Sequence, residues 1–149
     1  YSLDKSDKSK TSLRKELELI ELYLSIEKVR FGDRLDVDID VSSKALTCQV
    51  PCMLLQPLVE NAIKYAIELR KSGGKICIIA KQLNDRLLLQ VIDNGQESQN
   101  TVSDGFGIGL SNTKARLSAM FNGDFEVNIT NTLAGGTMVS ISIPFEKKT

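Results

Sequence analysis

The stretch of residues 54–65, LLQPLVENAIKY, constrains the fold more than any other part of the chain. In a helix its apolar residues form one broad face that needs burial, and its polar residues gather on the opposite side. Pro51 suits the first turn of this helix, whereas Pro57 lacks an N–H and should kink it or mark a break before Leu58. The predicted buried face comprises Leu54, Leu55, Leu58, Val59, Ala62 and Ile63, and the polar side comprises Gln56, Glu60, Asn61, Lys64 and Tyr65.

Residues 11–31 form a second helical pattern, with apolar residues at intervals of 4, 3, 4 and 7, as in a short a/d heptad seam. This pattern fits an amphipathic helix packed on its own domain or the end of a dimerising helical stalk. Leu19, Leu22 and Ile26 add a second apolar edge that could contact another surface, which favours the stalk. The residues of the seam are Leu13, Leu17, Ile20, Leu24 and Phe31.

Strand patterns occupy much of the remaining chain. RLDVDIDV alternates apolar and polar residues as a half-buried strand does, and Asn84-Asp85 joins two apolar runs as a tight hairpin. A loop rich in Gly, Ser, Asn and Asp is predicted for residues 94–109. A helix should follow over 110–121, with Leu110, Ala115, Leu117 and Met120 as candidate buried residues. The predicted strands are residues 34–41, 75–83, 86–93, 125–131 and 137–145.

This order of elements predicts an α/β fold. One sheet would carry its helices on one face, as a two-layer sandwich preceded by an N-terminal helix. With 149 residues, the chain is long enough for one domain with a full core.

The composition argues against several classes of function. The 19 basic residues equal the 19 acidic ones, so no net charge directs the chain to nucleic acid or an anionic membrane. The chain has no histidine, which argues against zinc sites and against Ser-His or Cys-His catalysis. Cys48, Cys52 and Cys77 form no metal-type pair and are interpreted as reduced structural thiols. No apolar run approaches the roughly 18–20 residues of a membrane span.

Four short motifs could carry chemistry. Glu60 and Asn61 share one side of the first helix with Lys64, although Glu60 and Lys64 also fit an ordinary i,i+4 pair. An aspartate at the exit of a strand, in Asp93-Asn94-Gly95, can accept a hydrogen bond from an exocyclic amine, and a following glycine permits close approach of a planar ring. Glycines that open a helix, in GFGIGL, let backbone N–H groups face a phosphate. The last motif is Gly135-Gly136-Thr137, which alone would be a hairpin turn.

Taken in order, these motifs resemble the N, G1, G2 and terminal Gly-Thr boxes of the GHKL ATPase superfamily. Within it, the chain resembles the ATP-binding catalytic domain of sensor histidine kinases of the LytS type. The phrases that carry the resemblance are YLSIEKVRFGDRL, VPCMLLQPLVENAIKYAI, GFGIGLSNTKARL and GGTMVSISIP, and it covers roughly residues 15–145. The resemblance implies a Bergerat-type mixed sheet and ATP with Mg²⁺ as ligands.

The resemblance also implies a role for each matched residue of the first helix. Asn61 would coordinate Mg²⁺ bound to the phosphates of ATP, and Glu60 would position water or the metal shell. Lys64 would reach a phosphate, and Tyr65, where LytS-type proteins often carry histidine, would pack near the adenine or the sugar. Glu60, Asn61 and Lys64 are thus the candidate catalytic residues.

The other boxes would complete the nucleotide site. Asp93 would bind the adenine amino group, supported by Thr137 through a water, and Gly95 would let the ring approach. Asn112 and Arg116 are lesser candidates for phosphate or lid contacts, with a place on the helix surface as the alternative. The glycine-rich box, expected to form the lid over the phosphates, comprises Gly105, Gly107, Gly109 and Leu110.

One residue departs from the family pattern. The G1 box usually reads Asp-x-Gly-x-Gly, but Glu97 replaces the second glycine. If the backbone there needs a positive φ, glutamate costs about 1 kcal/mol or more. Its charge would also lie near the nucleotide and weaken ATP binding unless it points to solvent.

The implied function is a protein-histidine kinase that supplies the γ-phosphate of Mg·ATP to a histidine in an upstream phosphotransfer domain, for relay to a response regulator. The alternatives are a hydrolytic GHKL ATPase, with Glu60 as general base, and a nucleotide-sensing pseudokinase. The expected divisions are a linker over residues 1–10, the end of a dimerisation and phosphotransfer stalk over 11–31, and the catalytic domain over 32–149. By resemblance, the full-length protein would be a homodimeric inner-membrane sensor with this domain in the cytoplasm.

Overall fold

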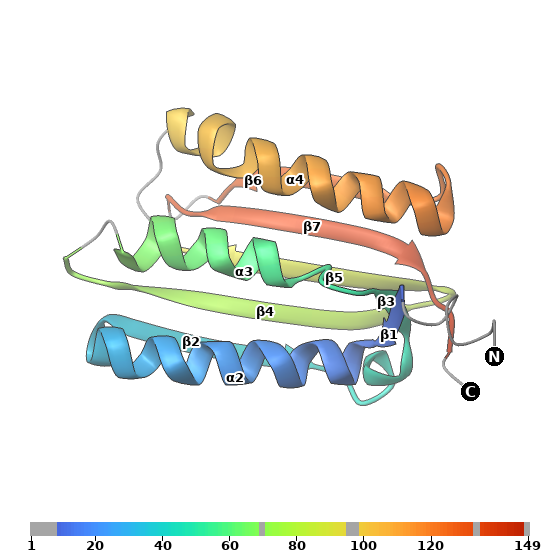
Figure 1. The fold of residues 1–149 in the computed structure, drawn as a ribbon, viewed down its shortest axis with the longest axis horizontal. Helices are drawn as coiled ribbons and strands as arrows, with labels where there is room; N and C mark the ends of the chain where they lie inside the picture. The colour runs from blue at the N-terminus through green and yellow to red at the C-terminus, as the bar shows by residue number, and fades with distance from the viewer. Residues whose placement is uncertain (1–8, 69–70, 95–98, 133–134, 148–149) are drawn as a thin grey trace.

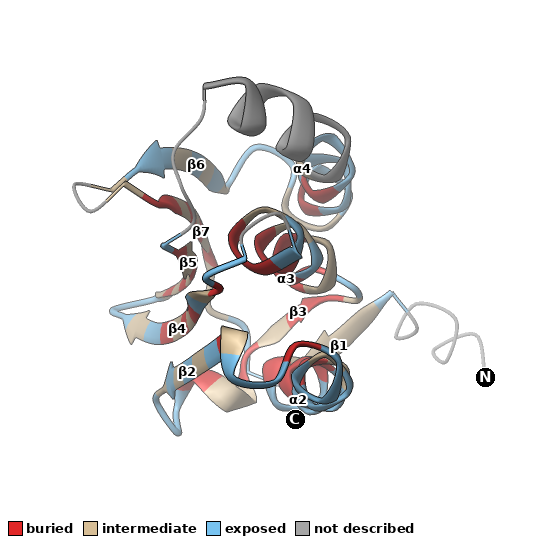
Figure 2. Cartoon of the chain, turned by 90° about the vertical axis from the view of Figure 1, so that its left-hand side faces the viewer, coloured by how far each residue is buried: buried red, intermediate tan, exposed pale blue. Residues whose placement is uncertain are grey.

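A single mixed sheet of five strands carries the fold in the computed structural model, which describes residues 9–68, 71–94, 99–132 and 135–147 (Figure 1). The strand order is β2-β4-β5-β7-β6, with β2 parallel to β4 and every other neighbouring pair antiparallel. The helices lie on one face of the sheet, which confirms the predicted two-layer α/β sandwich (Figure 2). The strands are β2 (Leu35–Val41), β4 (Gly74–Leu83), β5 (Arg86–Asp93), β6 (Glu126–Asn131) and β7 (Thr137–Pro144).

The helical layer consists of α2 (Leu13–Phe31), α3 (Gln56–Ile63) and α4 (Gln99–Phe121). Ser12 caps α2 by accepting a hydrogen bond from the N–H of Lys15, and Gly32 ends it with a φ of 58°. A π-helical turn, η3 (Lys64–Glu68), continues α3, and two 3-10 turns, η1 (Gly32–Arg34) and η2 (Ala45–Thr47), flank β2. No helix in the described part of the chain is both long and apolar enough to cross a membrane.

The core lies between the sheet and the helices. The six residues predicted to face inward from the first helix are all at most 2% exposed, so this prediction is confirmed. The predicted turn at Asn84 is also present, because Leu83 pairs with Arg86 and Asn84 has a φ of 57°. The alternation of β5 and β7 buries every second residue on the helical side.

The heptad seam of α2 lies in this same core. Its residues are buried together with those of α3 and the sheet, so α2 packs as part of the domain that follows it. The second apolar edge is exposed instead, at 55% for Leu19, 61% for Leu22 and 60% for Ile26. A stalk over residues 11–31 stays a prediction.

A small second sheet was not predicted. The strand β1 (Lys10–Ser12) pairs antiparallel with β3 (Gln49–Pro51) and joins the start of α2 to the segment before α3. Each strand has only three residues, too few for an alternating pattern to be recognised.

Three local predictions were wrong. Helix α4 begins at Gln99 rather than near residue 110, because glycine weakens a helix by about 1 kcal/mol but does not prevent one. Pro57, not Pro51, lies in the first turn of α3, where a missing N–H costs little. Ala115 is exposed, and among the side chains described in that helix the buried ones are Thr113 and the correctly predicted Leu117.

Candidate functional site

Two buried polar side chains lie at one end of the sheet, on adjacent strands. Asp93 is the last residue of β5 and Thr137 the first of β7, and the two are direct cross-strand partners. Asp93 is 5% exposed and Thr137 is 8% exposed. Polar residues are seldom buried to this extent without a structural or functional reason. The pair therefore places a buried carboxylate beside a buried hydroxyl.

The Gly135-Gly136-Thr137 motif lies directly against the Asp93-Asn94 motif. A Cβ added to Gly136 would be 1.8 Å from the carbonyl oxygen of Asp93, so the two backbones touch where only glycine fits. Thr132 holds the turn from the other side, since its hydroxyl accepts a hydrogen bond from the N–H of Gly136 at 2.9 Å. The structure thus brings together two motifs that lie more than 40 residues apart.

Asn94 is anchored to the neighbouring strand. Its Oδ1 accepts a hydrogen bond from the N–H of Lys75 at 2.6 Å, and its own N–H donates to the carbonyl of Lys75 at 3.2 Å. These two bonds fix the backbone just beyond Asp93. Gly95 and Glu97, the next two residues predicted to matter, lie outside the described residues.

The predicted polar side of α3 is solvent-accessible. Glu60 and Lys64 are exposed, and Asn61 and Tyr65 are half-buried. Glu60 accepts a hydrogen bond from Gln56 at 3.1 Å, and the ammonium of Lys64 lies 5.3 Å from the centre of the Tyr65 ring. Helix α3 packs against β5, the strand that ends at Asp93, and against α4. That the polar side of α3 and Asp93 share one nucleotide site stays a prediction.

The helix changes from α-helical to π-helical after Ile63. The N–H of Lys64 is shared between the carbonyls of Glu60 and Asn61, and the π-helical turn η3 follows. Such turns are rare and often lie at functional sites. The sequence carries no recognisable signal for this one.

The predicted residues of α4 have different surroundings. Leu110 is half-buried and Asn112 is exposed, and the backbone of Gly105, Gly107 and Gly109 is helical. Arg116 donates a hydrogen bond from Nη1 to the carbonyl of Cys52 at 2.8 Å. Its observed partner is thus the backbone just before α3. The lid role of the glycines stays a prediction.

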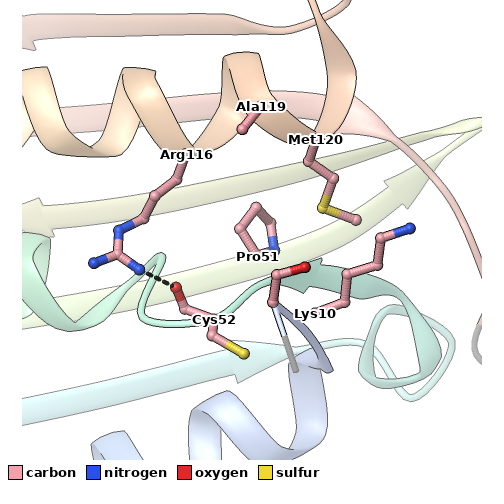
Figure 3. Close-up of a pocket in the computed structure, with 7 residues that line it drawn as sticks. Lys10, Pro51, Cys52, Arg116, Ala119 and Met120 are labelled. Carbon is pink, nitrogen blue, oxygen red and sulfur yellow. Dashed lines mark hydrogen bonds between the residues drawn. The ribbon is translucent and has the colours of Figure 1, made fainter. Parts of the chain in front are cut away.

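A cavity of about 400 Å³ lies beside Arg116, between α4 and the small β1–β3 sheet (Figure 3). Of the nucleotide-site residues predicted from the sequence, Arg116 is among the described residues that line this cavity, whereas Asp93 and Thr137 are not. Its described lining consists of Ser9, Lys10, Pro51, Cys52, Arg116, Ala119 and Met120.

Sequence reasoning missed a buried carboxylate under the start of α3. Glu16 of α2 is 3% exposed, and its two oxygens accept hydrogen bonds from the N–H groups of Met53 at 3.2 Å and Leu55 at 2.9 Å. The sequence feature that could have revealed Glu16 is its position three residues after Leu13, on the apolar face of the seam, where a charged residue is unexpected.

Tyr23 of α2 provides a pH-dependent test of the packing between α2 and α3. Burial, followed by the charges of Glu27, Glu60 and Glu68, raises the pKa of Tyr23 from 10.0 to about 12. The folded state therefore holds the phenolic proton more tightly than the unfolded state. This stabilisation is complete below pH 10 and is lost as the pH rises toward 12. In urea unfolding between pH 9 and 12, we expect Tyr23→Phe to lose less stability than the parent; parallel curves would contradict this.

Comparisons with known proteins agree with this arrangement. Residues 51–147 match the family model described as "Histidine kinase-, DNA gyrase B-, and HSP90-like ATPase", and residues 1–35 match the model described as "Histidine kinase". The chain is 32% identical to the sensor histidine kinase YesM of Bacillus subtilis over 136 residues and 32% identical to the sensor protein LytS of Enterococcus faecalis over 144 residues. Each alignment covers 89% of this chain and 24% of the relative, so the chain spans about a quarter of those proteins.

A solved structure shares the fold. The catalytic domain of the histidine kinase ThkA superimposes with a TM-score of 0.66, over 93% of this chain and 97% of that domain. The sequence identity of this pair is 14%, so the likeness concerns the arrangement of the sheet and its helices.

Proposed function

The chain belongs to the family of histidine kinase-, DNA gyrase B- and HSP90-like ATPases, and on that premise we propose that it is the ATP-binding catalytic domain of a sensor histidine kinase of the LytS type. The observation that carries nucleotide binding is the buried Asp93–Thr137 pair, with Gly136 against the Asp93 backbone. The match of residues 1–35 to a histidine kinase model supports a kinase over a hydrolytic ATPase.

The chemistry of the buried pair fits adenine. A carboxylate oxygen of Asp93 can accept a hydrogen bond from an exocyclic amino group, and the Thr137 hydroxyl can bind a bridging water. We propose that Lys64 binds a phosphate and that Tyr65 packs beside the nucleoside. Closure by the lid and contacts from Asn112 belong to the same proposal.

The amide oxygen of Asn61 is a suitable ligand for Mg²⁺, which prefers oxygen donors and is usually held by few protein groups together with substrate phosphates. When bound there, Mg²⁺ would neutralise part of the charge of the phosphates. The remaining task of the site is positioning: Glu60 and Asn61 present their polar groups from one helical turn, next to the widened backbone of η3.

The proposed reaction needs an acceptor from outside this chain, because the chain has no histidine. A histidine nitrogen of an upstream phosphotransfer domain would form the new N–P bond, and the bond between the γ-phosphorus and its bridging oxygen would break, releasing ADP. We also propose that the phosphate is relayed to a response regulator. The full-length protein would be a homodimeric membrane sensor with this domain in the cytoplasm.

Calorimetric titration with a non-hydrolysable ATP analogue tests the site. We expect Mg²⁺-dependent binding that Asn61→Ala weakens by about tenfold or more, because a bond to a charged group is lost. Asn128→Ala, at an exposed position of β6, is the matched control and should bind as the parent does. An Asn61→Ala variant with parental affinity would contradict the assignment.

Incubation with ATP and a separate LytS-type histidine domain tests the reaction. We expect phosphate on the added domain and little free phosphate, and the absence of histidine in this chain excludes a histidine-linked background. Steady phosphate release that Glu60→Ala abolishes would instead indicate the hydrolytic ATPase.

A further inference from the structure

The turn at residues 52–55, which leads into α3, is held by three other elements. The N–H of Cys52 donates to the carbonyl of Ser9 beside β1 at 3.0 Å. Arg116 of α4 donates to the carbonyl of Cys52 at 2.8 Å (Figure 3). Glu16 of α2 accepts the two bonds described above. The turn thus joins α2, α3 and α4 at a single point.

Glu16 is the contact that determines the shape of this turn. Its two oxygens take the N–H groups of Met53 and Leu55, which lie on either side of Leu54. Met53 has a φ of 61°, an uncommon conformation for a residue with a side chain. A carboxylate that binds both N–H groups favours this backbone over the extended alternatives.

Glu16 also replaces the missing cap of α3. Leu55, the N-cap residue, makes no side-chain capping bond, whereas its own N–H is bound by Glu16 from another helix. The negative charge then lies at the N-terminal end of α3, where the helix dipole favours it. Helix α2 therefore contributes to the position of the start of α3.

The nucleotide-binding residues proposed above are close to this anchor. Asn61 follows Leu55 by six residues, or about 9 Å along a helix, with no hinge between them in α3. Arg116 connects the same turn to α4, seven residues after Gly109. A displacement of the turn would thus move Asn61 and the glycine-rich segment together.

We propose that Glu16 is a positioning residue of the nucleotide site: by holding the 52–55 turn it places Asn61, so that the position of α2 sets the affinity for Mg·ATP. This inference rests on the proposed function. Since α2 lies within residues 1–35, the part that matches the histidine kinase model, Glu16 would link that region to nucleotide binding. Arg116 supports the same turn from α4.

The experiment measures nucleotide affinity and stability together in the 149-residue chain. The variants are Glu16→Gln, which keeps one acceptor oxygen, and Arg116→Ala, an exposed change that leaves the core intact. We expect Glu16→Gln to weaken binding of the Mg²⁺-loaded ATP analogue by about tenfold, because a small misplacement of a binding group lowers affinity steeply. Amide exchange at Met53 and Leu55 should accelerate in Glu16→Gln.

Ile20→Ala is the matched control. Ile20 is 0% exposed on the same face of α2, and its aliphatic side chain cannot accept a hydrogen bond from the 52–55 turn. It should lower the urea midpoint at least as much as Glu16→Gln and keep the parental affinity. Combined with Arg116→Ala, Glu16→Gln should show non-additive losses of affinity, because both residues hold one turn. If Glu16→Gln and Arg116→Ala both bind the analogue with parental affinity, the positioning role of Glu16 is overturned and the proposed function stands. If the parent binds no analogue, the proposed function itself is overturned.

Discussion

Gly136→Ala should disrupt both the fold and the site. The added Cβ would lie 1.8 Å from the Asp93 carbonyl oxygen and 2.8 Å from the Cα of Asn94, and both neighbours are backbone atoms that cannot rotate away. The ends of β5 and β7 would separate, at a cost of about 2–3 kcal/mol in unfolding free energy. Because Asp93 and Thr137 lie on these strand ends, affinity for the Mg²⁺-loaded ATP analogue should fall by about tenfold or more. Urea unfolding and calorimetry measure the two effects.

Two other glycines provide controls for Gly136→Ala. Gly123 has no atom within 4 Å of an added Cβ, so Gly123→Ala should leave stability and affinity unchanged. Gly135 is equally open but has a φ of 96°, so Gly135→Ala should cost about 1–2 kcal/mol through backbone strain alone. If Gly136→Ala behaved like Gly123→Ala, the two motifs would not be in contact as described.

Asp93→Asn should remove nucleotide binding while leaving the protein folded. The substitution keeps the size of a side chain that is 5% exposed, so the packing around it is preserved. It replaces one acceptor oxygen by an NH₂ donor, which would face the donor of the adenine amino group. We expect an affinity loss of about 100-fold for the ATP analogue, since a hydrogen bond to a charged group is lost and a donor is left unpaired. Thermal unfolding should change little.

Inosine triphosphate makes this prediction specific. Its base carries an oxygen where adenine carries the amino group, so the parent should prefer the adenine nucleotide strongly. In Asp93→Asn the new NH₂ can donate to that oxygen, and the preference should disappear or reverse. Asp38→Asn, at an exposed position of β2, is the control and should keep the parental preference. An unchanged preference in Asp93→Asn would show that Asp93 does not bind the base.

Much of the sheet and of α3 could be predicted because their patterns are local. The alternation of β2 and β5 follows from the two-residue period of a strand, and the two faces of α3 follow from the 3.6-residue period of a helix. Both periods can be recognised without knowing which element packs against them. The order of the four motifs was likewise visible in the chain. The family resemblance that these motifs carry could be recognised from the sequence alone, and the match of residues 51–147 supports it.

Boundaries and partners of helices were less predictable. The start of α4 was placed near residue 110 because glycines suggest a loop, yet helix formation extends back to Gln99. The seam of α2 fitted either a helix packed on its own domain or the end of a dimerising stalk, and in the structure the seam residues lie in the domain's own core. A periodic apolar stripe indicates that one face of a helix is buried, but it does not indicate which surface covers that face. Only the packed structure distinguishes burial in the same domain from burial against a second chain.

The sequence by itself determined the two-layer architecture, the inward face of α3 and the motifs that contain Asn61, Asp93 and Thr137. Tertiary structure decided which parts of the chain meet. It produces the Asp93–Thr137 pairing, the backbone contact at Gly136, and the hydrogen bond that the N–H of Leu55 donates to Glu16, 39 positions away. The physical reason is that periodicity encodes burial through nearest neighbours on one element. A carboxylate that binds a distant turn produces no repeating pattern in the sequence, and the turn comes within its reach only when the helices are packed.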